Sequence, residues 1–108
     1  MTETFGEYIK GLRNESGMTL TQLAAQLDLD SANLSKIENG KRDFDEKRLE
    51  QLSVALKLDL NKLKTEFYGN LFAKKLYENK CSNDVLIVAE KKVKYLRSIN
   101  VKQANLEL

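Results

Sequence analysis

The sequence of 108 residues contains no histidine, no proline and no tryptophan, and it has one cysteine and five glycines. Because proline is absent and glycine is scarce, the chain lacks the turn residues that the many short strands of an all-β fold require. We therefore expect an all-α fold. Without histidine, Cys81 has no imidazole that could activate it as a nucleophile. No glycine-rich phosphate loop is present either, and we therefore expect that the protein is not an enzyme.

The single cysteine also bears on the compartment. Cys81 cannot form an intrachain disulfide or a cysteine-only metal site, and nothing requires an oxidising environment. The first residues lack the basic start and the apolar run of a signal peptide, and no segment approaches the roughly 20 apolar residues that cross a bilayer. We expect a cytoplasmic protein with no metal, no cofactor and no membrane partner.

Local patterns have to indicate the function, because a formal net charge of +2 says little about nucleic-acid binding. One pattern recurs: an apolar residue, a capping residue, and a leucine five positions after the apolar one. Its four copies begin at Met18, Leu29, Phe44 and Leu58. The cap accepts a free backbone N–H, and the two apolar side chains pack as a hydrophobic staple. The pattern predicts helices at about 20–27, 31–39, 46–57 and 60–68, and a capping box formed by Thr4 and Glu7 predicts a first helix at about 5–15.

The second and third predicted helices are separated only by Asp28, Leu29 and Asp30. A connection this short forces a sharp angle and is typical of a helix-turn-helix, whose second helix enters the major groove of DNA. Leu34 and Ile37 define the buried side of the third helix. The opposite side carries short polar residues, so this helix is the predicted recognition helix.

The predicted contacts with DNA follow from this geometry. Lys36 can donate to guanine, Asn33 can pair with adenine, and the Ala32 methyl can touch a thymine methyl. The expected base contacts are Ser31, Ala32, Asn33 and Lys36. Phosphate contacts are expected from helix N-termini and nearby basic or polar residues. These are Thr19, Thr21, Ser35, Asn39, Lys41 and Arg42, with Lys47 and Arg48 as weaker candidates. The alternative for each residue alone is an ordinary solvated helix face.

The run LSKIENGK at residues 34–41, preceded by Met18-Thr19, Leu23-Ala24, Leu27 and Leu29, resembles the phage-repressor (Cro-like, XRE) helix-turn-helix family. The resemblance covers about residues 5–63. It implies a five-helix repressor-type DNA-binding domain with a double-stranded DNA operator as its partner. It also implies a structural ion pair between Arg13 and Glu38.

Two residues depart from the pattern of the family. The first position of the second helix is usually a glutamine that contacts a phosphate, and here it is Leu20. That contact is lost, or Thr19 or Thr21 replaces it. The turn often contains glycine, and here it has Asp28, which tolerates the left-handed conformation better than most residues. The turn is therefore expected to form.

Residues 69–98 exceed the minimal domain at 1–68 and predict a C-terminal helical extension. An apolar stripe runs along it through Leu86, Ala89, Val93 and Leu96. Regulators of this type bind two-fold operators as dimers, so we expect this stripe to form a homodimer interface. The alternatives are an extended core or, as in a DNA-binding antitoxin, a surface that grips a partner protein. Residues 99–108 are expected to be a flexible tail.

The function that these observations favour is sequence-specific regulation of transcription. The protein is expected to be a repressor or controller that reads a short pseudo-palindromic operator with its third helix. Because the small domain leaves no room for a ligand pocket, we expect no small-molecule effector. The alternative function is a protein-interaction module in which DNA binding is secondary.

Overall fold

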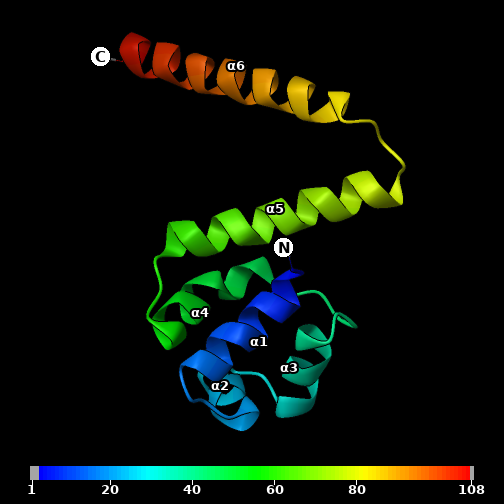
Figure 1. Ribbon diagram of the computed structural model, residues 1–108. Helices are drawn as coiled ribbons and strands as arrows, with labels where there is room; N and C mark the ends of the chain where they lie inside the picture. The colour runs from blue at the N-terminus through cyan, green and yellow to red at the C-terminus, as the bar shows by residue number, and fades with distance from the viewer. Residues whose placement is uncertain (1–2, 108) are drawn as a thin grey trace. The chain divides into compact units, whose positions relative to one another are not determined.

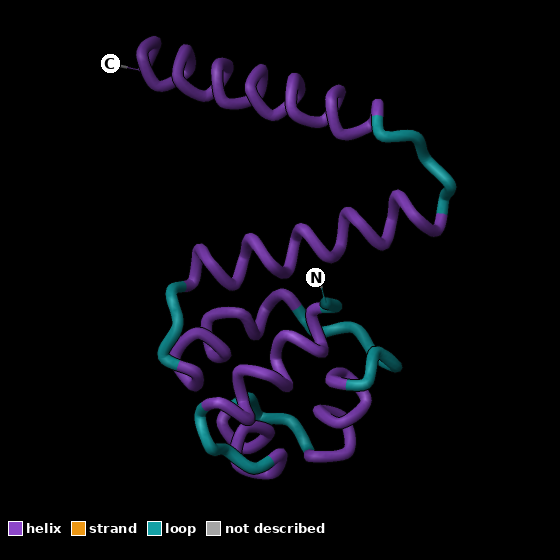
Figure 2. The backbone as a smooth tube through the Cα atoms, viewed as in Figure 1, coloured by secondary structure: helices purple, strands orange, loops and turns teal. Residues whose placement is uncertain are grey.

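The computed structural model describes the backbone of residues 3–107 and the side chains of residues 3–100. The helices are α1 (Phe5–Glu15), α2 (Leu20–Gln26), α3 (Ser31–Glu38), the 3₁₀ turn η1 (Glu46–Arg48), α4 (Leu49–Leu56), α5 (Leu60–Glu78) and α6 (Asp84–Glu107) (Figure 1). No strand occurs in residues 3–107 (Figure 2), which confirms the all-α fold. The chain forms two compact units, Met1–Phe72 and Ala73–Leu108.

Side-chain caps begin α1, α2, α3 and α5 as the sequence predicts. Helix α4 has no side-chain cap, because the predicted cap Asp45 begins η1 instead. Thr4 Oγ1 accepts the backbone N–H of Glu7 at 3.2 Å, and Thr19 Oγ1 accepts that of Gln22 at 3.1 Å. In both helices the side-chain oxygen of the third residue in turn accepts the backbone N–H of the cap, which completes a capping box. Asp59 accepts a backbone N–H of α5 at 3.2 Å in the same way. Each cap satisfies a donor that the helix itself cannot pair.

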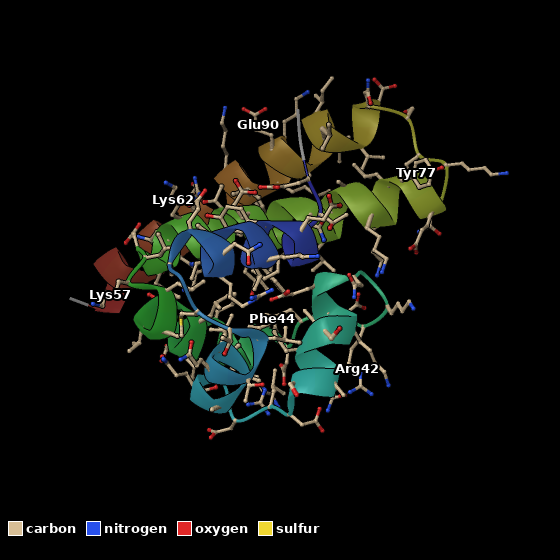
Figure 3. All side chains as sticks on the ribbon, turned by 60° about the horizontal axis from the view of Figure 1, so that its bottom comes forward. Arg42, Phe44, Lys57, Lys62, Tyr77 and Glu90 are labelled. Atoms are coloured by element: carbon tan, nitrogen blue, oxygen red, sulfur yellow. The ribbon has the colours of Figure 1, made fainter. Side chains whose placement is uncertain are left out.

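One apolar core holds the first unit together. Its buried side chains are Phe5, Ile9, Leu23, Ala24, Leu27, Leu34, Ile37, Phe44, Leu49, Leu52, Leu56 and Leu63. Phe5 packs against two other aromatic rings. The centroid of its ring lies 5.5 Å from that of Phe44 and 5.2 Å from that of Phe67. Figure 3 labels Phe44 within this unit. Because Phe67 belongs to α5, these rings fasten the first half of α5 to α1.

Helices α1 and α3 approach closely because residue 6 is glycine. Gly6 is buried, and a Cβ atom at this position would lie 2.2 Å from the backbone oxygen of Ile37. Any larger residue would therefore push the backbones of the two helices apart. The position of α3 on the domain depends on this contact.

The second half of the chain differs from the expected helices. The helix expected at 46–57 consists of η1 and α4. The domain boundary expected after residue 68 falls inside α5, which runs unbroken to Glu78 because a single interior glycine costs a helix only about 1 kcal/mol. The expected flexible tail at 99–108 is helical as far as Glu107, and Leu108 lies outside the described residues.

Candidate nucleic-acid interface

The connection between α2 and α3 is a Schellman turn followed directly by a helix cap. Asp28 has a φ of 56°. The N–H groups of Leu29 and Asp28 donate to carbonyls near the end of α2 at 2.9 and 3.3 Å, respectively. Asp30 then accepts the backbone N–H of Asn33 at 2.7 Å and begins α3. Asp28 adopts the left-handed conformation that the sequence predicts. The angle between the two helices is therefore set by hydrogen bonds between residues that are close in the sequence.

The outer face of α3 presents the side chains that are expected to contact bases. Ala32 and Lys36 are exposed, whereas Ser31 and Asn33 are half-buried at the N-terminal end of the helix. Leu34 and Ile37 point the other way and are buried in the core. The exposed set is short and polar, so this face can enter a groove about 12 Å wide.

The start of α2 offers two of the expected phosphate contacts. Thr19 and Thr21 are both exposed. The Oγ1 atom of Thr19 accepts the capping bond from Gln22, which leaves its O–H to donate to an external acceptor. Leu20 is half-buried against the core. The phosphate contact that the resemblance assigns to glutamine at this position is therefore absent.

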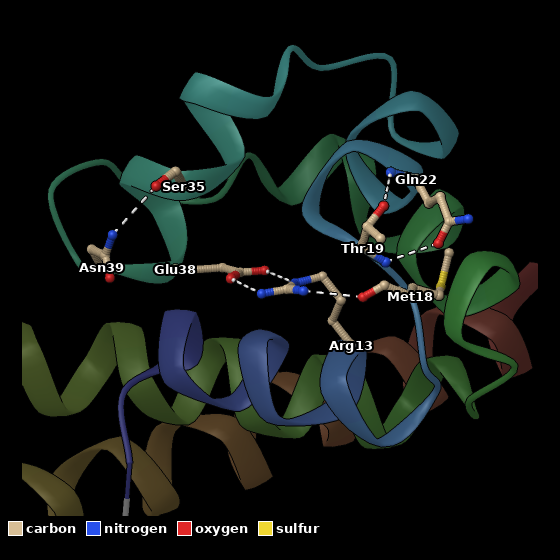
Figure 4. Close-up of polar contacts among 7 residues, drawn as sticks. All are labelled: Arg13, Met18, Thr19, Gln22, Ser35, Glu38 and Asn39. Atoms are coloured by element: carbon tan, nitrogen blue, oxygen red, sulfur yellow. Dashed lines mark hydrogen bonds and ion pairs between the residues drawn. The ribbon is translucent and has the colours of Figure 1, made fainter.

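The residues after α3 form a second group of expected phosphate contacts. Some of their side chains make hydrogen bonds to side chains of α3. Lys41 is exposed. The Nδ2 atom of Asn39 donates to Ser35 Oγ at 3.4 Å (Figure 4). Arg42 is exposed, lies beside α3 in Figure 3, and donates from Nη1 to Oδ1 of Asn33. The structure thus joins a phosphate candidate to a base candidate, which no sequence pattern indicates.

Arg48 has a role that the sequence does not reveal. Its Nη1 donates to the backbone oxygen of Leu27, which ends α2. A cation at this end of a helix also complements the negative end of the helix dipole. Arg48 therefore stabilises the turn from within the protein, a role separate from the phosphate contact for which the sequence makes it a weaker candidate.

The ion pair that the resemblance implies joins α1 to α3. Arg13 Nε donates to Oε2 of Glu38 at 2.8 Å, and Nη2 donates to Oε1 at 3.0 Å. Nη1 also donates to the backbone oxygen of Met18 at 3.0 Å (Figure 4). The hydrogen bond to the buried Glu38 raises the pKa of Arg13 above its ordinary value. The stability that this raised pKa of Arg13 contributes is therefore present at neutral pH and is lost as the pH rises through that pKa.

The apolar stripe expected at a dimer interface is exposed on α6. The exposed fractions are 54% for Leu86, 42% for Val93 and 58% for Leu96, and Ala89 is exposed as well. An apolar stripe of this extent is uncommon on a monomeric protein surface. Among the described residues no helix is long and apolar enough to cross a membrane.

Comparison with known proteins gives a consistent result. A family model described as Helix-turn-helix matches residues 9–63, about half of the chain. The HTH-type transcriptional repressor RghR of Bacillus subtilis (strain 168) is 36% identical over 83 residues, which are 73% of this chain and 62% of RghR. The chain thus spans less than two thirds of RghR. The control protein C.MunI of a Mycoplasma species is 42% identical over 60 residues, which are 55% of this chain and 81% of C.MunI.

A solved structure shares the fold around the turn. The crystal structure of SinR, the master regulator for biofilm formation, in complex with DNA is 30% identical, with a TM-score of 0.50. The match covers 56% of this chain and 97% of the SinR chain. The similarity therefore extends over a whole DNA-bound domain of that protein and about half of this one.

Proposed function

The chain belongs to the helix-turn-helix family, and we propose that it is a DNA-binding transcriptional regulator that reads a short pseudo-palindromic operator with α3 in the major groove. The observation that carries the proposal is the outer face of α3. Its polar side chains are accessible, while the helix is held by the core, the Schellman turn and the Arg13–Glu38 pair.

The base contacts proposed here come from the accessible side chains of α3. The Lys36 ammonium donates to O6 and N7 of a guanine, and the Ala32 methyl lies against a thymine methyl. Ser31 and Asn33 contact base edges from the N-terminal end of the helix, which is the end that enters deepest. Each good base contact contributes about 1–3 kcal/mol of discrimination.

The phosphate contacts proposed here come from the start of α2, from α3 itself and from the residues that follow α3. They are Thr19, Thr21, Ser35, Asn39, Lys41 and Arg42. The N-terminus of α2 adds backbone N–H groups, which favour an anion. Such contacts fix the register of the protein on the duplex but carry no sequence information. They should make binding strongly dependent on salt, because each neutralised phosphate releases counterions.

We further propose that two copies bind together through the apolar stripe of α6. A dimer presents two recognition helices about 34–36 Å apart, which matches successive major grooves. The charges of α6 favour a second copy as the occupant. Asp84 and Glu90 precede the basic residues of 91–97, so an antiparallel pair of α6 helices places opposite charges together. In this proposal the protein acts in the cytoplasm without a small-molecule effector or a catalytic role.

Two alanine variants test the reading of DNA by α3. Lys36→Ala should weaken binding to the operator by about 1–3 kcal/mol and relax base preference at one position. Lys41→Ala should weaken operator and random DNA alike, and its salt dependence should fall by about 0.9 in the slope of log K against log salt. Fluorescence anisotropy at several salt concentrations measures both effects. Equal losses from both variants on specific and random DNA would contradict the placement of α3.

A further inference from the structure

Arg42 and Asn33 are brought together by the reversal of the chain after α3. Gly40 has a φ of 76°, and the N–H of Lys41 donates to the backbone oxygen of Lys36 at 2.8 Å. The chain therefore turns back along α3, and Arg42 comes to lie beside the helix (Figure 3). Its Nη1 donates to Oδ1 of Asn33, nine residues earlier.

This contact determines which way the Asn33 carboxamide points. Arginine has only hydrogen-bond donors, so the atom of Asn33 that it binds must be the oxygen. The positive guanidinium also polarises the carboxamide, because hydrogen bonds in a chain strengthen one another. The Nδ2 group of Asn33 thus becomes a stronger donor, and its oxygen becomes a weaker acceptor.

The four bases respond differently to such a side chain. In the major groove adenine presents the acceptor N7 and the N6 amino donor, so asparagine reads it with both its nitrogen and its oxygen. Guanine presents two acceptors, N7 and O6. A carboxamide that acts mainly as a donor is therefore better suited to guanine than to adenine.

We propose that Arg42 is a specificity-determining positioning residue that shifts the base preferred by Asn33 from adenine to guanine. This inference rests on the proposed placement of α3 in the major groove. Arg42 retains further guanidinium N–H groups that can bind a phosphate. One side chain then links a contact with the DNA backbone to the choice of a base. The adenine pairing that the sequence alone predicts for Asn33 is replaced.

Competition binding on operator variants tests this inference. Asn33→Ala identifies the position that Asn33 reads, as the one at which base discrimination is lost. At that position Arg42→Ala should shift the ratio of guanine to adenine affinity towards adenine by roughly tenfold, within the range for one base contact. Lys41→Ala is the matched control, because it removes the same charge from the neighbouring residue and should leave the ratio unchanged.

The outcomes separate this inference from the proposed function. If the wild type selects an operator but Arg42→Ala leaves the ratio unchanged, or weakens all four bases equally, the role of Arg42 is overturned. The role of Arg42 is also overturned if Asn33→Ala retains base discrimination at every operator position. A wild type without any sequence preference contradicts the proposed function itself.

A second readout needs no DNA. In NMR spectra of the free protein, Arg42→Ala should shift the side-chain amide signals of Asn33, whereas Lys41→Ala should leave them in place. If neither variant moves these signals, the contact between Arg42 and Asn33 does not form in solution, and the proposal is overturned.

Discussion

Gly6 and Gly11 lie in the same helix but have opposite surroundings. A Cβ atom at Gly6 would meet the backbone oxygen of Ile37 at 2.2 Å, whereas nothing lies within 4 Å of a Cβ atom at Gly11. Alanine is the better helix former by about 1 kcal/mol at both positions. The sign of the effect of alanine therefore depends on the neighbouring backbone and not on the helix itself.

Gly6→Ala is expected to lower the free energy of unfolding by about 2 kcal/mol, which is the upper end of the usual overpacking cost less the gain in helix propensity from alanine. Overpacking typically costs about 1–3 kcal/mol, and here the opposing atom is a backbone oxygen that cannot rotate away. Gly11→Ala should raise the free energy of unfolding by about 0.5–1 kcal/mol. Urea denaturation followed by circular dichroism measures both. If Gly6→Ala were as stable as the wild type, the close approach of α1 and α3 would be wrong.

At the scale of the elements, α1 to α5 all end in the same way. One or two residues after the last residue of each helix the backbone φ is positive, and the residue that follows donates its N–H to the carbonyl five positions back. The positive-φ residues are Gly17, Asp28, Gly40, Lys57 and Lys80. In four cases the next residue is apolar or a cysteine and stands before a residue of capping type. In these four cases the same residue therefore hydrogen-bonds to the end of one helix and directly precedes the capping residue of the next.

Lys57→Gly should stabilise the domain by about 0.5–1 kcal/mol. A side chain in the left-handed region costs about 1–2 kcal/mol, and the greater freedom of glycine in the unfolded chain offsets part of that gain. Lys57 is exposed with a φ of 54°. Lys57→Ala removes the same amine but keeps Cβ, so its melting temperature should stay near that of the wild type. Equal gains from both variants would show that backbone strain is not the cause.

The oligomeric state of the whole molecule should depend on the exposed apolar stripe of α6, and with it whether the protein binds DNA as a dimer or as a monomer. Val93→Asp is expected to convert a dimer into a monomer, because an aspartate at a buried interface carries an unpaired charge. Operator affinity should then fall, since two half-sites are no longer bound by one particle. Sedimentation equilibrium and anisotropy measure the two effects.

The control for this variant is Val54→Asp on α4. Val54 is 77% exposed in the first unit, so the same change there should alter neither mass nor affinity. A monomeric wild type with tight operator binding would contradict dimerisation through α6. A wild type that is stable only in a defined complex with another protein, lost in Val93→Asp, would favour the partner-gripping alternative.

The local sequence is enough to predict where α1, α2, α3 and α5 begin and how α2 turns into α3. Thr19, Asp28 and Asp30 act on backbone groups within a few residues, so their effect is readable before folding. The outer face of α3 was equally readable, because helical periodicity places residues opposite a buried Leu34 on the surface.

Which polar groups of the interface remain available to DNA depends on how the helices and turns pack against one another. Arg48 binds a carbonyl 21 residues away, and Arg42 binds a side chain nine residues away across the reversal of the chain. The backbone contact at Gly6 likewise depends on a second helix. Such contacts form only when separate helices are packed together, so local propensity and spacing carry no record of them.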